Sequence, residues 1–157
     1  MNGLLSFLIA FLIVSSMRYF AGLSMTEQNF EWYYSLKTYE YMPPDYTFTV
    51  AWATIYSLLA GAIANLLMSF PLKALTAPAV FFVIHYLLHI SWSYLFFELH
   101  HVLYGFYCTI ALLIFLLATM YQTSKISMLS AVLLLPYALW LGVAIYLSWQ
   151  TVYLNFG

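Results

Sequence analysis

Charged residues are scarce in this chain, because Asp, Glu, Lys and Arg together make up 6% of its 157 residues. A soluble domain carries about 25% charged residues, so this composition excludes a soluble globular enzyme. The four Lys and Arg residues are too few for a basic surface, which excludes nucleic acid as a partner. The single cysteine, Cys108, excludes an intrachain disulfide and a zinc site built on cysteines.

Apolar residues dominate instead, since 66% of the chain is hydrophobic and 21% is aromatic. The few charges separate five long uncharged windows, and a transmembrane helix needs roughly 20 mostly apolar residues. We therefore predict an all-α, multi-pass integral membrane protein in which residues 1–157 form one domain. Arg18 falls in the first span and is expected to snorkel to the interface. The predicted five-helix bundle has spans at about 3–23, 46–70, 75–97, 101–122 and 127–152.

The connection between the first two predicted spans, residues 24–44, is long for so compact a bundle. A loop of this length is usually functional, for example as a lid over a site. A passive linker is the alternative, but such linkers are seldom aromatic. We expect a folded lid or interfacial segment, and residues 24–44 are called the lid below. Its aromatic residues are Phe30, Trp32, Tyr33, Tyr34, Tyr39 and Tyr41.

Three motifs follow one another along the chain. The first joins Trp32-Tyr-Tyr-Ser-Leu36 to Pro43-Pro44 and to Phe48-Thr-Val-Ala-Trp52-Ala-Thr-Ile-Tyr56. The second is His89-Ile-Ser-Trp92-Ser-Tyr-Leu-Phe96-Phe97, and the third is Pro136-Tyr137-Ala-Leu-Trp140 followed by Leu147. In these motifs and their spacing the chain resembles the TspO/translocator protein family, also called tryptophan-rich sensory proteins or peripheral benzodiazepine receptors. The resemblance covers nearly the whole chain and implies five transmembrane helices.

The sequence departs from the family pattern at several polar positions. The Gln and Asn of the family's third span fall on His85 and His89, and its Lys-Pro pair falls on Thr38-Tyr39. An acidic residue early in its fourth span falls near Cys108. The aromatic residues of the motifs are kept, while polar groups of the family's pocket are exchanged.

Aromatic residues at helical spacing are compatible with a ligand pocket. Trp52 and Tyr56 share one helix face, and His85, His89, Trp92 and Phe96 form a stripe along another helix. A cavity between such stripes would be apolar with a few polar groups, as small-molecule pockets are. Ordinary bundle packing and aromatic belts at the interface are the alternatives. By position in the motifs, the resemblance implies ligand-binding residues at Tyr33, Trp52, Tyr56, His85, His89, Trp92, Cys108 and Trp140.

Two histidines four residues apart, His85 and His89, could also chelate a metal from one helix face. The predicted span that carries them has no carboxylate to complete such a site, so we predict no dedicated metal site. Two alternatives stay open for the pair. The histidines either contact a haem, or they are neutral polar residues that hydrogen-bond to neighbouring helices.

The resemblance implies a membrane receptor or sensor that binds porphyrin, haem or a similar planar apolar ligand, in tetrapyrrole homeostasis or a stress response. Porphyrin or haem would then be a ligand, and no firmly held cofactor is predicted. One alternative is an enzyme that degrades porphyrin with light and oxygen, with Trp52 and Trp140 as catalytic residues. The other is sterol or lipid binding or transport, for which the segment from Leu117 through Tyr121 to Lys125 fits a loose cholesterol pattern.

The partners expected from this resemblance are a tetrapyrrole or other apolar small molecule, the lipid bilayer and a second copy of the chain. The membrane would be that of a bacterial cell envelope or the mitochondrial outer membrane. A stripe of small residues would let helices approach closely, within one protomer or in a homodimer. The stripe consists of Ala53, Ser57, Ala60 and Ala64.

Overall fold

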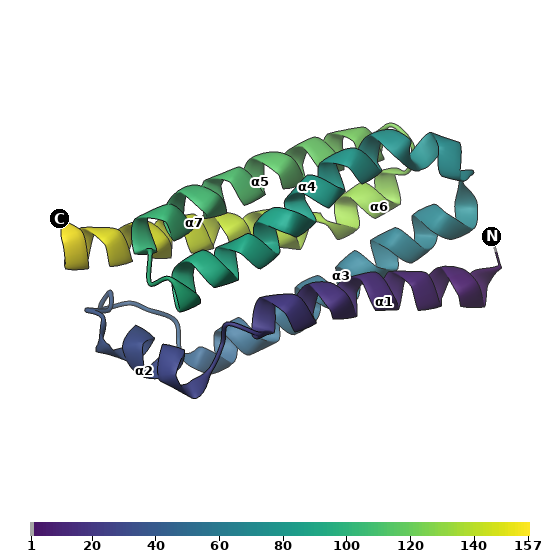
Figure 1. Ribbon diagram of the computed structural model, residues 1–157. Helices are drawn as coiled ribbons and strands as arrows, with labels where there is room; N and C mark the ends of the chain where they lie inside the picture. Colours follow the sequence, from purple (N-terminus) through teal and green to yellow (C-terminus); the bar gives the residue numbers. More distant parts are fainter. Residues whose placement is uncertain (1) are drawn as a thin grey trace.

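The computed structural model describes residues 2–157, and this part of the chain is helical, without β-strands (Figure 1). Within it, five segments are long and apolar enough to cross a membrane. The predicted all-helical fold with five membrane spans is therefore confirmed, and the observed ends lie close to the predicted ones. The five segments are Gly3–Gly22, Asp45–Ser69, Leu72–Glu98, Val102–Ser124 and Met128–Phe156.

The elements that build these segments are long α-helices with a few shorter turns. The long helices are α1 (Gly3–Gly22), α3 (Asp45–Ser69), α4 (Thr76–Ser93), α5 (Val102–Ser124) and α7 (Leu135–Phe156). Shorter elements are α2 (Glu27–Ser35) in the lid, the 3-10 turn η1 (Leu72–Leu75), the π-helical turn η2 (Tyr94–Glu98) and α6 (Met128–Leu133).

The last predicted span, 127–152, is found as the segment Met128–Phe156, which is built from two helices. α6 ends before Leu134, and α7 begins directly after it. Pro136 explains the break, because proline has no N–H to donate and its ring clashes with the carbonyl four residues earlier. The two pieces together are still long enough to span the bilayer.

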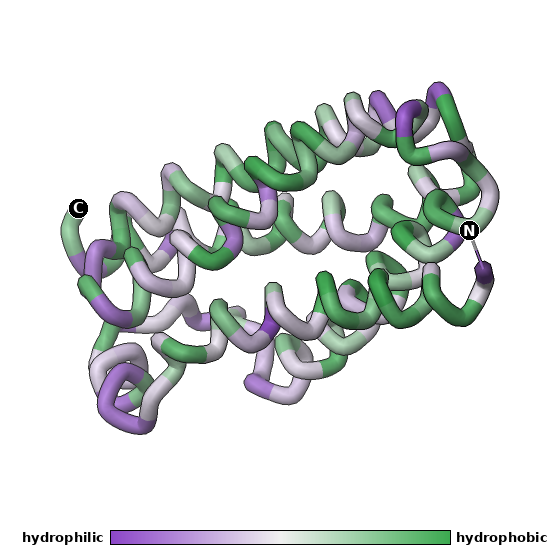
Figure 2. Tube along the Cα trace, turned by 45° about the vertical axis from the view of Figure 1, so that its right-hand side comes forward, coloured by the Kyte–Doolittle hydropathy of each residue, from purple (hydrophilic) through white to green (hydrophobic). Residues whose placement is uncertain are grey.

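The helices pack in two groups that lie side by side (Figures 1 and 2). α1 packs on α3, whereas α4 packs on α5 and α5 on α7. α6 contacts both α3 and α5 and so joins the two groups at one end. There the amide of Asn65 donates to the hydroxyls of Ser127 and Ser130, at 3.1 and 2.8 Å.

The outer faces of the long helices are apolar. Phe11, Leu12, Val83, Ile114 and Leu139 are each more than half exposed. Soluble monomers rarely expose so much contiguous apolar surface, whereas lipid chains solvate it well. Figure 2 shows the hydrophilic residues mostly in the lid and at the helix ends, as expected for a bundle in a bilayer.

The lid folds at the end of the bundle where α7 ends, and its helix α2 docks on the π-helical turn η2. The Asn29 amide donates to the Glu98 carboxylate at 3.0 Å, and the Phe30 and Phe97 rings lie 5.5 Å apart. Trp32 stacks on His100 at 4.0 Å, with an angle of 14° between the ring planes. Within residues 24–44, α2 is thus the helical part, and it is held against the bundle by these contacts.

The π-helical turn η2 shapes the surface that α2 covers. The Leu99 N–H donates to the Tyr94 carbonyl at 3.0 Å, five residues back. The wider turn places two neighbours in the sequence, Phe96 and Phe97, in the interior, each 6% exposed. Gly105 of α5 makes room, because a Cβ there would lie 3.0 Å from the Phe96 ring. Such turns occur frequently at functional sites.

Candidate functional site

Side chains from α3, α4 and α7 meet between the two groups of helices. The Trp52 ring centroid lies 5.4 Å from that of Tyr56, 5.2 Å from His89 and 5.7 Å from Tyr137. Tyr56 is offset-stacked at 29°, whereas His89 and Tyr137 meet Trp52 edge to face. Three predicted site residues, Trp52, Tyr56 and His89, are therefore brought together, along with one that was not predicted.

A continuous chain of hydrogen bonds runs behind Trp52, called the His/Tyr chain below. The Tyr56 hydroxyl lies 3.1 Å from His89 Nε2, and the Tyr137 hydroxyl lies 3.1 Å from His89 Nδ1. The same Tyr137 hydroxyl lies 3.0 Å from His85 Nε2, while His85 Nδ1 lies 3.0 Å from the carbonyl of Leu112. His85, His89 and Tyr137 are all buried, so the chain ties α3, α4, α5 and α7 together away from water.

The carbonyl at the end of the His/Tyr chain fixes where every hydrogen lies. No acidic side chain on these helices faces the histidines, so both imidazoles are taken as neutral. A carbonyl only accepts, so His85 Nδ1–H donates to Leu112, and His85 Nε2 must accept from the Tyr137 hydroxyl. The Tyr137 oxygen then accepts from His89 Nδ1–H, and His89 Nε2 accepts from the Tyr56 hydroxyl.

This chain bears on the two alternatives for the histidine pair. Both ring nitrogens of His85 and both of His89 take part in hydrogen bonds, so neither ring offers a free nitrogen to an iron atom. Coordination of haem would have to break one of these bonds. The geometry therefore fits neutral polar residues. Among residues 2–157 there is no group of three or more His, Cys, Asp or Glu that could hold a metal ion.

Trp92 and Tyr33 lie at a second aromatic group, where the lid contacts the bundle. The Tyr33 ring lies 6.0 Å from Phe96, and Trp92 stacks on Phe96 at 5.4 Å and 9°. Trp92 also packs against the buried residues that surround Trp52, so it connects the lid to the first group. Its indole Nε1 is buried and has no hydrogen-bond partner within the described chain. Burying an unpaired donor is costly, and a ligand acceptor would relieve that cost.

The remaining predicted residues lie at the edge of this arrangement. Trp140 packs against the same buried residues as Trp52 and meets Phe48 edge to face at 5.5 Å. The buried Cys108 thiol donates to the Leu88 carbonyl at 3.4 Å, so it binds the backbone of α4.

Sequence reasoning missed Tyr137, which is 1% exposed and occupies the centre of the His/Tyr chain. A signal for it was present, because Tyr137 belongs to the third motif and a buried tyrosine hydroxyl needs a partner. Pro136, which opens the third motif, is exposed. The interior face begins one residue later.

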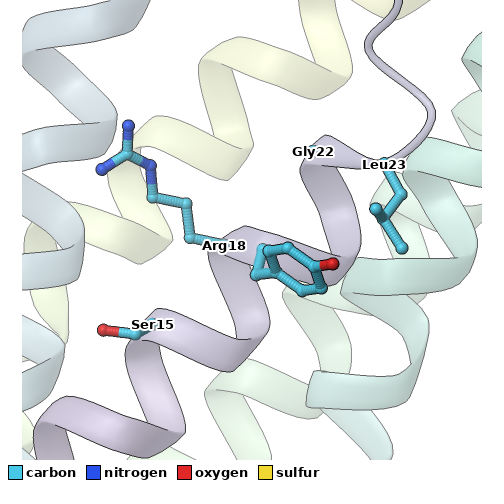
Figure 3. A pocket seen from close by; sticks show the side chains of 5 residues that line it. Ser15, Arg18, Gly22 and Leu23 are labelled. Carbon is cyan, nitrogen blue, oxygen red and sulfur yellow. The ribbon is translucent and has the colours of Figure 1, made fainter.

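Two hollows on the surface lie outside this aromatic arrangement. One is lined by Ser15, Arg18, Tyr19, Gly22 and Leu23 of α1 and its end (Figure 3). The other lies between the end of α1 and α4. It is lined by Phe20, Leu23, Ser24, Ile90, Ser91, Tyr94 and Leu95.

Polar contacts hold the rest of the lid to the bundle. The Tyr34 hydroxyl donates to the Asp45 carboxylate at 3.0 Å, and this hydrogen bond raises the pKa of Tyr34 above its usual 10.0. The side chain of Asn155, near the end of α7, accepts from the Lys37 N–H at 2.9 Å and donates to the Lys37 carbonyl at 3.0 Å. The lid is thereby fastened to both α3 and α7.

Comparison with known proteins gives a consistent family. The model of the TspO/MBR family matches residues 7–154. The chain is 30% identical over 138 residues to Tryptophan-rich protein TspO of Chlorobaculum tepidum, covering 87% of each chain. It is 31% identical over 129 residues to Protein CrtK of Rhodobacter capsulatus, covering 80% of this chain and 79% of the relative. It is 24% identical over 125 residues to Tryptophan-rich sensory protein of Cereibacter sphaeroides, covering 80% and 77%.

Proposed function

This chain belongs to the TspO/MBR family, and we propose that it is a membrane receptor or sensor whose ligand is a porphyrin or a similar planar apolar molecule. The family and its tryptophan-rich relatives support the sensor or receptor role, and the bacterial relatives support a location in a membrane. The ligand class, and with it a role in tetrapyrrole homeostasis or the stress response, is our proposal.

The observation that carries the ligand class is the aromatic group around Trp52. Stacked and edge-to-face rings from α3 and α7 offer flat apolar surfaces, on which a conjugated ligand can stack. The buried, unpaired indole N–H of Trp92 offers a hydrogen bond to an acceptor on that ligand. Because no ring nitrogen of His85 or His89 is free, the ligand is held by stacking and not through an iron atom.

The lid provides a way to detect whether ligand is bound beside Trp92. α2 packs on Phe96 and Phe97, and Phe96 stacks on Trp92, so the lid and the aromatic group share one set of contacts. A ligand beside Trp92 would stabilise these contacts. Amide hydrogen exchange in residues 24–44 should then slow when ligand is added, and unchanged exchange at saturation would contradict this role for the lid.

The test is a fluorescence titration of the purified protein with protoporphyrin IX. Trp52→Ala and Trp140→Ala should each weaken binding by about 1–3 kcal/mol, the scale of one lost aromatic contact. Trp149→Ala is the matched control, because Trp149 is 49% exposed on α7 and its aromatic contact is with Phe106. Equal affinity for all three variants and the unmodified protein would refute the proposal.

Two further measurements separate the alternatives. Under illumination the receptor leaves bound porphyrin unchanged, whereas a new absorbing product that depends on Trp52 would make the protein an enzyme. Haem and protoporphyrin IX should bind with similar affinity, and the haem spectrum should be the same in His85→Gln and His89→Gln. A tighter affinity for haem that is lost in either variant would instead assign an iron ligand.

A further inference from the structure

Arg18 is an unusual residue in this structure, because it is a cation within a membrane-spanning helix. It lies on α1, four residues before that helix ends at Gly22, and its side chain is exposed. Within residues 2–157 no carboxylate is placed to pair with it. Two acidic side chains at span ends, Asp45 and Glu98, are instead hydrogen-bonded to Tyr34 and Asn29. An ionisable group in a membrane span is a functional candidate whose partner must be identified.

The surface hollow around Arg18 is lined by residues of α1 and of its end. Ser15, Arg18 and Gly22 are spaced by three and four residues and therefore share one face of α1. Gly22 leaves this face open, since a Cβ there would meet nothing within 4 Å. Figure 3 shows Ser15 and Arg18 extending from the same side of the helix, while Leu23 points to the other side. Two polar side chains that line the hollow, Ser15 and Arg18, thus lie on one side of α1.

The helix turn that carries Arg18 also packs against the core beside the aromatic group. Met17, next to Arg18, belongs to the buried cluster against which Trp52, Tyr56 and Trp140 pack. The Tyr56 hydroxyl is the outer end of the His/Tyr chain. In that chain the Tyr56 hydroxyl donates inward to His89, so its proton is not available for an anion, and Arg18 supplies the donors.

We propose that the hollow on α1 binds the oxyanion of an amphipathic acid, with Arg18 as the ion-pairing residue and Ser15 as an additional hydrogen-bond donor. The apolar body of that molecule lies against the aromatic group, so the inference rests on the proposed function and adds a requirement for an acidic substituent. A guanidinium suits this role because its planar set of N–H donors matches a carboxylate or a phosphate in a bidentate arrangement.

The experiment compares protoporphyrin IX, which has two carboxylates, with its dimethyl ester, which keeps the ring and loses the charge. Both are titrated into protein in bilayer discs of phosphatidylcholine, and the ratio of the two affinities is compared between proteins so that membrane partitioning cancels. The unmodified protein should favour the free acid by about tenfold or more, the scale of a charged hydrogen bond. Arg18→Gln should abolish this preference, and Arg18→Lys should keep part of it.

Lys73→Gln is the matched control, because Lys73 is an exposed cation in η1, at the opposite end of the bundle from the lid. It should leave the preference unchanged. If Arg18→Gln retains the preference, or if acid and ester bind the unmodified protein equally, the inference is wrong while the proposed function stands. If neither porphyrin binds, the proposed function fails, and this inference fails with it.

A lipid phosphate is a second source of the same oxyanion, and one further arm identifies it. Phosphatidylglycerol is added to the discs, and the titrations are repeated with the unmodified protein and Arg18→Gln. Weaker porphyrin binding in the unmodified protein alone would support the hollow as an oxyanion site that lipid also occupies. An equal effect in both proteins would be a bulk charge effect and would count against lipid at Arg18.

Discussion

Replacing Tyr137 by Phe removes one oxygen atom from the centre of the His/Tyr chain. That hydroxyl accepts from His89 Nδ1–H and donates to His85 Nε2, so two interhelical hydrogen bonds are lost together. Hydrogen bonds between membrane helices contribute about 0.6 kcal/mol on average and up to about 1.7 kcal/mol, so Tyr137→Phe should lower the free energy of unfolding by about 1–3 kcal/mol. Tyr56→Phe removes only the outermost bond and should cost about half as much.

The chain contains its own reporter for this measurement. Cys108 is its single cysteine and is buried against the backbone of α4, so a thiol-reactive dye labels it when the bundle opens. Unfolding is followed as a function of the concentration of denaturing detergent. Tyr153→Phe is the control, because Tyr153 lies on α7, as Tyr137 does, and is 62% exposed. The double variant Tyr56→Phe/Tyr137→Phe tests coupling. Because His89 lies between Tyr56 and Tyr137, the effects of the two single substitutions on stability should not add.

The expected order of stability is Tyr153→Phe equal to the unmodified protein, then Tyr56→Phe, then Tyr137→Phe. Equal stability of Tyr137→Phe and Tyr153→Phe would refute the assignment of a hydrogen-bonded chain. A larger loss for Tyr56→Phe than for Tyr137→Phe would refute the central position of Tyr137 in the chain.

Three further results are expected. Trp92→Phe removes a buried N–H without a partner, so it should leave stability unchanged or raise it slightly while weakening porphyrin binding; a clear loss of stability, seen by the dye assay, would show that the N–H is already paired. Asn155→Ala removes both side-chain bonds to the Lys37 backbone, so exchange of the Lys37 amide should quicken roughly tenfold, and an unchanged rate would contradict the clamp. The raised pKa of Tyr34 means that its hydrogen bond to Asp45 contributes to stability below pH 10 and is lost as the pH rises through the raised value. The difference titration between the unmodified protein and Tyr34→Phe should therefore have a midpoint above pH 10.0. In Asp45→Asn this midpoint should fall.

The number and position of the membrane spans could be predicted because they depend on composition alone. Charged residues and prolines mark where a membrane-spanning segment ends, so the spans could be predicted without knowledge of how the helices pack. The break at Leu134 was missed because the run of apolar residues continues through it. The proline two positions later was the available signal.

The site was harder, because it depends on which faces of different helices meet. The spacing of Trp52 and Tyr56 predicted a shared face correctly, but spacing within one helix says nothing about the helix opposite. Tyr137 therefore could not be placed against His85 and His89 from its own helix. The π-helical turn η2 was equally hidden, because it places Phe97 in the interior beside Phe96, whereas regular helical spacing assigns only Phe96 to that face.

The ending of the His/Tyr chain at the Leu112 carbonyl has a consequence for a protein embedded in an energised membrane. A proton entering at the Tyr56 hydroxyl could pass by successive transfers through His89 and Tyr137 to His85. There the transfer stops, because the next group is a peptide carbonyl that accepts a hydrogen bond but passes no proton onward. The four titratable groups therefore do not form a continuous proton path across the bilayer. The bundle can hold them without leaking protons down the membrane potential.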